Sequence, residues 1–106
     1  MDINILTDLV MKQAKDKGFG TKPEEIDVFE KLVLIHSEIS EAVEDYRHRE
    51  MDKFGGNLAD TMQRILHLAG IYGIDLEDRM VQKIRANKER MWEWDKMNTN
   101  TRIGEK

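Results

Sequence analysis

Hydrophobic residues recur along the chain at spacings of three and four, which is the period of an α-helix and not of a β-strand. Seven glycines and a single proline interrupt this pattern and divide it into segments. The pattern predicts helices over roughly residues 4–17, 21–50, 57–72 and 76–94. We therefore expect an all-α protein with four helices in a bundle-like arrangement.

Small and capping residues predict where these helices begin and end. Thr21 with Glu24 three residues later resembles a capping box and predicts the start of the second helix. The pair Gly55-Gly56 predicts a break between the second and third helices. The other expected helix boundaries lie at Gly18, Gly73 and Asp75.

The length of 106 residues limits the chain to one domain, which we place over residues 1–94, followed by a polar tail at 95–106. Charged residues make up 36% of the chain and hydrophobic residues 40%, a balance that favours a folded domain over a disordered one. A chain this short, with its seven methionines mostly on helix stripes, has little interior of its own. We therefore expect the bundle to be completed by association with further copies.

The net charge of −4 gives no reason to expect a nucleic-acid or membrane partner. The first ten residues carry acidic groups where a signal peptide would carry basic ones, which predicts a cytoplasmic protein. Because the chain has no cysteine, a metal would have to be held by oxygen or imidazole ligands. Carboxylate and amide ligands favour hard cations.

Carboxylates gather on one side of the second predicted helix, where Glu38, Glu41 and Asp45 follow one another at spacings of three and four. They repel unless a cation lies among them, although a solvated acidic surface explains the same spacing. On the third predicted helix, Asp60 shares a strip with Asn57, and it is also placed to pair with Arg64.

If the second and third helices pack antiparallel, the strip of Asn57 and Asp60 faces Glu38 and Glu41. Four oxygen-bearing side chains would then converge, as a Mg²⁺ site on two helices requires.

The fourth predicted helix carries polar side chains inside or beside its apolar stripe: Lys83, Asn87 and Arg90. Long Lys and Arg side chains can extend from the edge of a core to solvent, which is one interpretation. An amide at that angle must be hydrogen-bonded, so the alternative is a basic and amide surface that binds phosphates or a base.

Three motifs on successive predicted helices carry a family resemblance: Glu38-x-x-Glu41, Asn57-x-x-Asp60 and Lys83-x-x-x-Asn87-x-x-Arg90. In this order they resemble the MazG-like nucleotide pyrophosphohydrolases of the all-α nucleoside triphosphate pyrophosphatase superfamily. The resemblance covers most of residues 5–90 and implies a MazG-type fold.

The resemblance implies an enzyme that uses Mg²⁺, or alternatively Mn²⁺, to split a nucleoside triphosphate between its α and β phosphates. The family pattern is ExxE followed by ExxD, in which all four side chains bind metal. Glu38, Glu41 and Asp60 match this pattern, whereas Asn57 stands at the third acid and lowers the ligand charge. Glu38 or Glu41 would orient the attacking water.

The same resemblance implies that Lys83, Asn87 and Arg90 bind the substrate and that the protein is a homodimer or homotetramer. Two alternatives stay open. One is phosphoribosyl-ATP pyrophosphohydrolase, which performs the same chemistry in the same superfamily. The other is a helical interaction module with weakened catalysis, an alternative that Asn57 keeps open.

Overall fold

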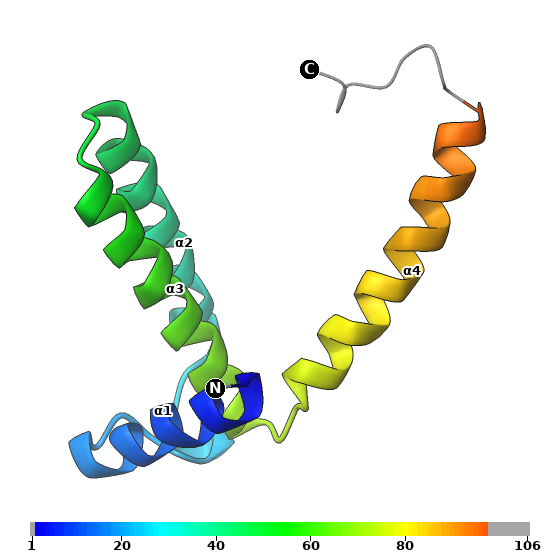
Figure 1. Ribbon diagram of the computed structural model, residues 1–106. Coiled ribbons are helices and arrows are strands. Elements are labelled where there is room, and N and C mark those ends of the chain that lie inside the picture. The colour runs from blue at the N-terminus through cyan, green and yellow to red at the C-terminus, as the bar shows by residue number, and fades with distance from the viewer. Residues whose placement is uncertain (1, 98–106) are drawn as a thin grey trace. The chain divides into compact units, whose positions relative to one another are not determined.

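The computed structural model describes residues 2–97, and within this range the protein is all-helical with no β-strand (Figure 1). The elements are α1 (Ile3–Lys17), a short 3-10 turn (Pro23–Glu25), α2 (Val28–Arg47), α3 (Met51–Ile71) and α4 (Leu76–Met97). The prediction of an all-α protein with four helices is confirmed.

The chain divides into two compact units between Leu76 and Glu77. The first unit contains α1, α2 and α3, and the second contains α4. The single domain expected over residues 1–94 stays a prediction, and residues 98–106 of the expected tail lie outside the described residues. Among residues 2–97, no helix has both the length and the apolar character needed to cross a membrane.

Helix α1 is capped at both ends by its own sequence. The Asp2 carboxylate accepts a hydrogen bond from the Ile5 N–H at 2.8 Å, which satisfies one of the free donors of the first turn. Gly18 ends the helix in the left-handed conformation with φ 76°, as the sequence predicted. The following Phe19 N–H donates back to the Ala14 carbonyl at 2.9 Å.

Helix α2 begins later than its predicted start near Thr21, so that prediction is wrong. Asp27 caps the helix instead, because its carboxylate accepts the Phe29 N–H at 3.0 Å. The Thr21 N–H is held at 2.8 Å by the Glu25 carboxylate, and this hydrogen bond lowers the pKa of Glu25. The residues before Asp27 therefore form a separate short turn.

The turn between α2 and α3 lies before Gly55-Gly56, and the predicted break at this pair is wrong. Both glycines lie inside α3, where a glycine costs only about 1 kcal/mol relative to alanine. The chain reverses at Arg49, which has φ 59°. The rings of Tyr46 and Phe54, with centroids 5.7 Å apart, join the two helices across this turn.

Helix α3 ends where the sequence predicted. Gly73 has φ 64°, and the Ile74 N–H returns to the Ala69 carbonyl at 2.9 Å. Helix α4 begins at the predicted residue, Leu76, and continues to Met97, which is three residues beyond the predicted end at 94.

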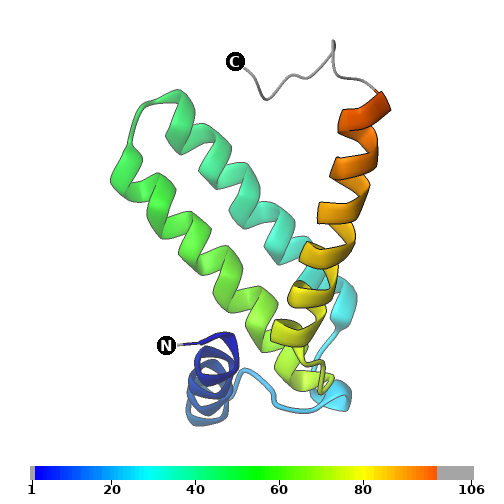
Figure 2. The same cartoon turned by 45° about the vertical axis from the view of Figure 1, so that its right-hand side comes forward.

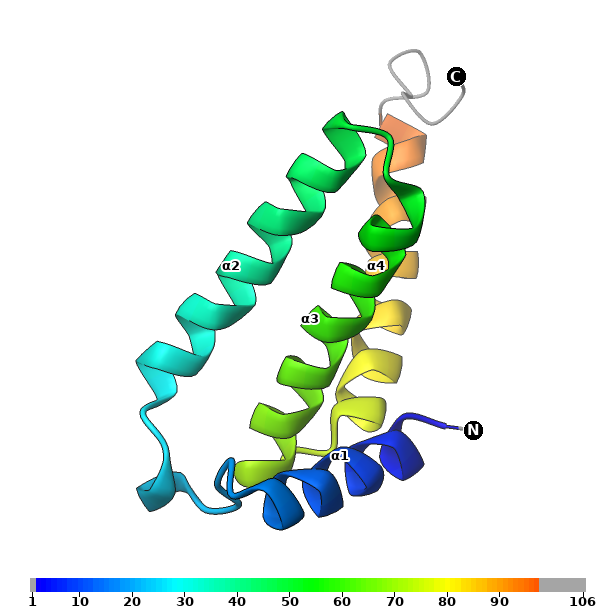
Figure 3. The ribbon, with the colours of Figure 1, turned by 90° about the vertical axis from the view of Figure 1, so that its left-hand side faces the viewer.

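The first unit is built around α3. Helix α2 runs antiparallel to α3 and packs along it, while α1 lies across the end of α3 (Figures 2 and 3). A Cβ atom added to Gly70 would lie 2.5 Å from Met11 Cγ, so glycine allows α1 to approach α3 closely. The buried residues of the described chain are Ala14, Ala42, Thr61, Leu66, Ala69 and Ile71.

The apolar residues that recur at helical spacing along α2 suggest one core-facing side: Leu32, Ile35, Ile39, Ala42, Val43 and Tyr46. The structure buries only part of this side. Ala42 is buried and Ile35 is half-buried. The other large apolar side chains of this side are exposed: Leu32, Ile39, Val43 and Tyr46. Within the first unit α2 packs against α3, and one neighbouring helix covers only a narrow stripe of a helix surface.

Candidate functional site

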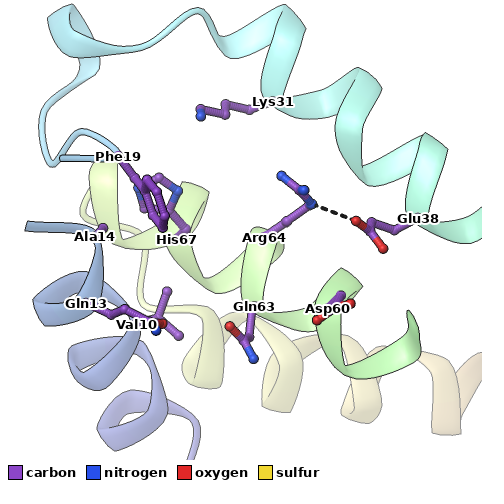
Figure 4. A pocket seen from close by; sticks show the side chains of 10 residues that line it. All are labelled: Val10, Gln13, Ala14, Phe19, Lys31, Glu38, Asp60, Gln63, Arg64 and His67. Atoms are coloured by element: carbon purple, nitrogen blue, oxygen red, sulfur yellow. Dashed lines mark hydrogen bonds and ion pairs between the residues drawn. The ribbon is translucent and has the colours of Figure 1, made fainter. Parts of the chain in front are cut away.

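A cavity of about 470 Å³ lies in the first unit between α1, α2 and α3 (Figure 4). Its volume falls within the usual range for small-molecule sites, about 300–1,000 Å³. Its walls are formed by Val10, Gln13, Ala14, Phe19, Lys31, Glu38, Asp60, Gln63, Arg64 and His67.

Helical periodicity explains why charged residues of two helices line the same cavity. Asp60, Arg64 and His67 are spaced by four and three residues, so they lie on one face of α3. Lys31 and Glu38 are seven residues apart and lie two turns from each other on α2. The antiparallel packing of α2 and α3 brings these two faces together.

An ion pair between α2 and α3 crosses the cavity. The Arg64 Nε donates to Glu38 Oε1 at 3.2 Å (Figure 4). The Glu38 side chain is only 13% exposed, and that of Arg64 is 38% exposed, so solvent screens this pair less than the exposed pair of Glu44 and Arg47 on α2. Arg64 therefore pairs with Glu38 and not with Asp60, the partner that spacing alone allowed.

Two charged groups of the cavity have no ion-pair partner within the described part of the chain, namely Asp60 and Lys31. Figure 4 shows Lys31 extending from α2 over the cavity, while Asp60 lies on the α3 side. The cavity thus presents two carboxylates and two cationic groups. A ligand that carries phosphates and a bound cation matches both signs of charge.

The structure brings together two of the four metal ligands that the resemblance implies. Glu38 and Asp60 line the cavity, whereas Glu41 is exposed on α2 and is not part of the cavity wall. The Asn57 Nδ2 donates to Asp45 Oδ2 at 2.5 Å, and both side chains are half-buried. The Asn57 amide is therefore engaged with α2 away from the cavity wall.

The two cavity carboxylates set a limit on the metal that this site can hold. Among the residues that the structure describes, no group of three or more Asp, Glu or His side chains is placed to hold a metal ion. Mg²⁺, however, is commonly held by one or two carboxylates together with substrate phosphates and water. Glu38 and Asp60 fit an ion that is bound together with a phosphate ligand.

The predicted substrate-binding strip lies in the second unit, on α4. Lys83, Asn87 and Arg90 are all exposed, and their spacing of four and three residues places them on one face of that helix. Their role in binding substrate stays a prediction.

The sequence did not identify four side chains of the cavity wall as groups that could contact a ligand: Phe19, Lys31, Arg64 and His67. Arg64 and His67 could have been found from the sequence, because they lie four and seven residues after Asp60 and so share its helix face. Lys31 had no such signal, since its place over the cavity depends on how α2 packs against α3.

The fold and the cavity define a small all-helical protein with a charged cavity of ligand size. Comparisons of the chain with models of known protein families, with curated proteins and with solved structures found no match.

Proposed function

We propose that this protein is a Mg²⁺-dependent nucleoside triphosphate pyrophosphohydrolase, which releases a nucleoside monophosphate and pyrophosphate. One observation carries the proposal: Glu38 and Asp60, from two different helices, line one cavity together with Lys31 and Arg64. Carboxylates beside cationic groups are the residues that bind and cleave phosphate chains. The resemblance to the MazG-like pyrophosphohydrolases supports the same activity.

The cationic side chains are proposed to bind the phosphates. Arg64 offers a planar set of N–H donors that matches phosphate oxygens, and Lys31 adds a second positive charge across the cavity. Glu38 accepts a hydrogen bond from Arg64 at 3.2 Å. On binding, a phosphate oxygen would replace the Glu38 carboxylate as the acceptor for Arg64. Lys83, Asn87 and Arg90 share one exposed face of α4, and their binding of substrate stays a prediction from the family resemblance.

The acidic side chains are proposed to place the metal and the attacking water. When bound, Mg²⁺ would neutralise charge that develops on the phosphoryl oxygens. Glu38 accepts a hydrogen bond from water and orients it for in-line attack on the α phosphorus. The water oxygen bonds to phosphorus, the bond to the bridging oxygen breaks, pyrophosphate leaves, and the water proton passes to the carboxylate. Because Glu41 is not part of the cavity wall, Glu38 is the better supported of the two candidates.

A pyrophosphate-release assay tests this function, with Mg²⁺ and a panel of ribo- and deoxynucleoside triphosphates that also includes phosphoribosyl-ATP. We expect turnover of at least one substrate by the wild type and a loss of about 100-fold or more in Glu38→Gln and in Asp60→Asn. Glu44→Gln is the matched control, since Glu44 lies on the same helix in an exposed ion pair with Arg47. Circular dichroism checks that all variants keep the helical fold.

Two results would contradict the proposal. Wild-type turnover in both Glu38→Gln and Asp60→Asn would mean that these acids form only a solvated surface. Absence of pyrophosphate release from every substrate would favour the helical interaction module. The engagement of Asn57 with Asp45 is the observation that favours this second function, because it removes one oxygen ligand from a metal site.

A further inference from the structure

The end of the cavity farthest from the acids is aromatic. In Figure 4 the rings of Phe19 and His67 lie at one end of the labelled side chains, Glu38 and Asp60 lie at the other, and Arg64 lies between them. The wall that α1 adds at the aromatic end consists of Val10, Gln13 and Ala14. The cavity therefore changes along its length from acidic, through cationic, to aromatic.

The Phe19 ring is exposed although its backbone is held in place. The residue is 55% exposed, yet its N–H is bonded to the Ala14 carbonyl at 2.9 Å. The next residue, Gly20, has φ 98°, and a Cβ atom there would lie 2.7 Å from Ile26 Cγ2. Only glycine suits that position in the observed conformation of the loop.

The His67 ring is tied to the same loop. Its Nε2 donates to the Gly20 carbonyl oxygen at 2.8 Å, and the residue is half-buried in α3. This hydrogen bond joins the loop that carries Phe19 to the helix that carries Arg64. Two rings are thus held at one end of a cavity whose other end is charged.

We infer that Phe19 and His67 form the subsite for the heteroaromatic base of a nucleotide whose phosphates lie at Arg64 and Lys31. A flat ring joined to a phosphate chain matches the order of groups along the cavity wall. Aromatic side chains stack on any nucleobase, because every base presents a π face. The inference rests on the proposed function, which places the phosphates at the cationic groups.

A competing explanation for Phe19 is local. After a left-handed glycine cap, an apolar residue at this position commonly covers the last turn of the helix, and here Ala14 is the residue it would cover. That role requires an apolar side chain but not an aromatic one. Phe19→Leu and Phe19→Trp therefore form a matched pair, since both keep an apolar contact and only the second keeps a ring.

Calorimetric binding to the full chain in the presence of Mg²⁺ tests the subsite. The ligands are α,β-methylene analogues of the common nucleoside triphosphates and inorganic tripolyphosphate, which has no base. We expect Phe19→Leu to weaken binding of the preferred analogue on the order of tenfold, with Phe19→Trp close to wild type. Binding of tripolyphosphate should change less than about twofold in either variant, whereas Arg64→Met should weaken both ligands.

The outcomes separate the subsite from the proposed function. The subsite is overturned if Phe19→Leu binds the analogue as tightly as wild type does, or if its affinity falls equally for the analogue and for tripolyphosphate. In either case, turnover by the wild type still supports the proposed function. If the wild type binds neither ligand, the proposed function and the subsite both fail. Should Phe19→Leu not fold, the tryptophan fluorescence of Phe19→Trp is followed during titration with the analogue. The wild type, which has two tryptophans of its own, supplies the background signal to subtract. Quenching supports stacking, and an unchanged signal overturns it.

Discussion

At the scale of single residues, two polar contacts between α2 and α3 determine which side chains face the cavity. Arg64 crosses to Glu38 at 3.2 Å, and Asn57 crosses to Asp45 at 2.5 Å. Both contacts are partly shielded from water, where unpaired polar groups are costly. The first contact leaves a carboxylate and a guanidinium on the cavity wall, and the second directs an amide away from it.

Replacing the Asn57 donor tests the second contact. In Asn57→Asp the amide that bonds to Asp45 becomes another carboxylate, so a hydrogen bond is lost and two like charges meet. We expect the free energy of unfolding in Mg²⁺-free buffer to fall by about 1–3 kcal/mol, measured by urea denaturation. Mg²⁺ should restore part of this loss, more than KCl at equal ionic strength does, because two carboxylates attract a divalent ion.

Asn57→Ala serves as the control for this experiment, since it removes the hydrogen bond without adding a charge. An unfolding midpoint equal to that of wild type in Asn57→Asp would show that the amide does not hold Asp45.

At the scale of the elements, caps and glycines have opposite effects on the helices. Asp2 and Asp27 satisfy free N–H groups and stabilise the starts of α1 and α2. Gly55 and Gly56 weaken α3, because a glycine inside a helix loses more conformational freedom on folding than alanine does. Gly70 lies in the same helix but has a packing role, since α1 approaches α3 there.

Alanine substitutions should separate these two kinds of glycine. No atom lies within 4 Å of a Cβ added at Gly55 or Gly56, so Gly55→Ala and Gly56→Ala should each raise the free energy of unfolding, by about 0.5–1 kcal/mol. Gly70→Ala should lower it by about 1–3 kcal/mol, because the new Cβ would overlap Met11. Urea denaturation at one protein concentration measures all three, and a stabilised Gly70→Ala would contradict the close packing of α1 on α3.

At the scale of the whole molecule, the first unit by itself carries many exposed apolar side chains, most of them on α1 and α2. Within the described residues no large side chain is completely buried, while Phe29 is 76% and Val33 is 63% exposed. Large exposed apolar surfaces are common where protein chains associate. That the protein is a homo-oligomer stays a prediction, in which a second copy would cover such side chains.

Light scattering tests this prediction. At micromolar concentration we expect a mass of two or four times the 12.5 kDa of one chain. Ile39→Glu, which adds a charge to the exposed apolar side of α2, should shift the mass toward that of one chain. Ser37→Glu, at an exposed polar position of the same helix, should not. A wild-type mass of 12.5 kDa would contradict the prediction.

The sequence by itself determined the helical class, the end of α1 at Gly18, the end of α3 at Gly73 and the start of α4 at Leu76. These features depend on hydrophobic periodicity and on glycine geometry, which act over a few neighbouring residues. The start of α2 and the turn before α3 were mispredicted, because several nearby residues can cap or reverse the chain there. The observed turn before α3 is accompanied by the contact between the rings of Tyr46 and Phe54, which lie on different helices.

Only the tertiary structure decided which polar residues share the cavity. Asp60 and Arg64 lie on one helix face by spacing alone, but the partner of Arg64 is Glu38, which is 26 residues away. Phe19 and His67 meet the same cavity because α1 and its loop pack against α3, a contact that no local pattern encodes. Spacing along a helix determines the face on which a side chain lies, and packing between helices determines what that face meets.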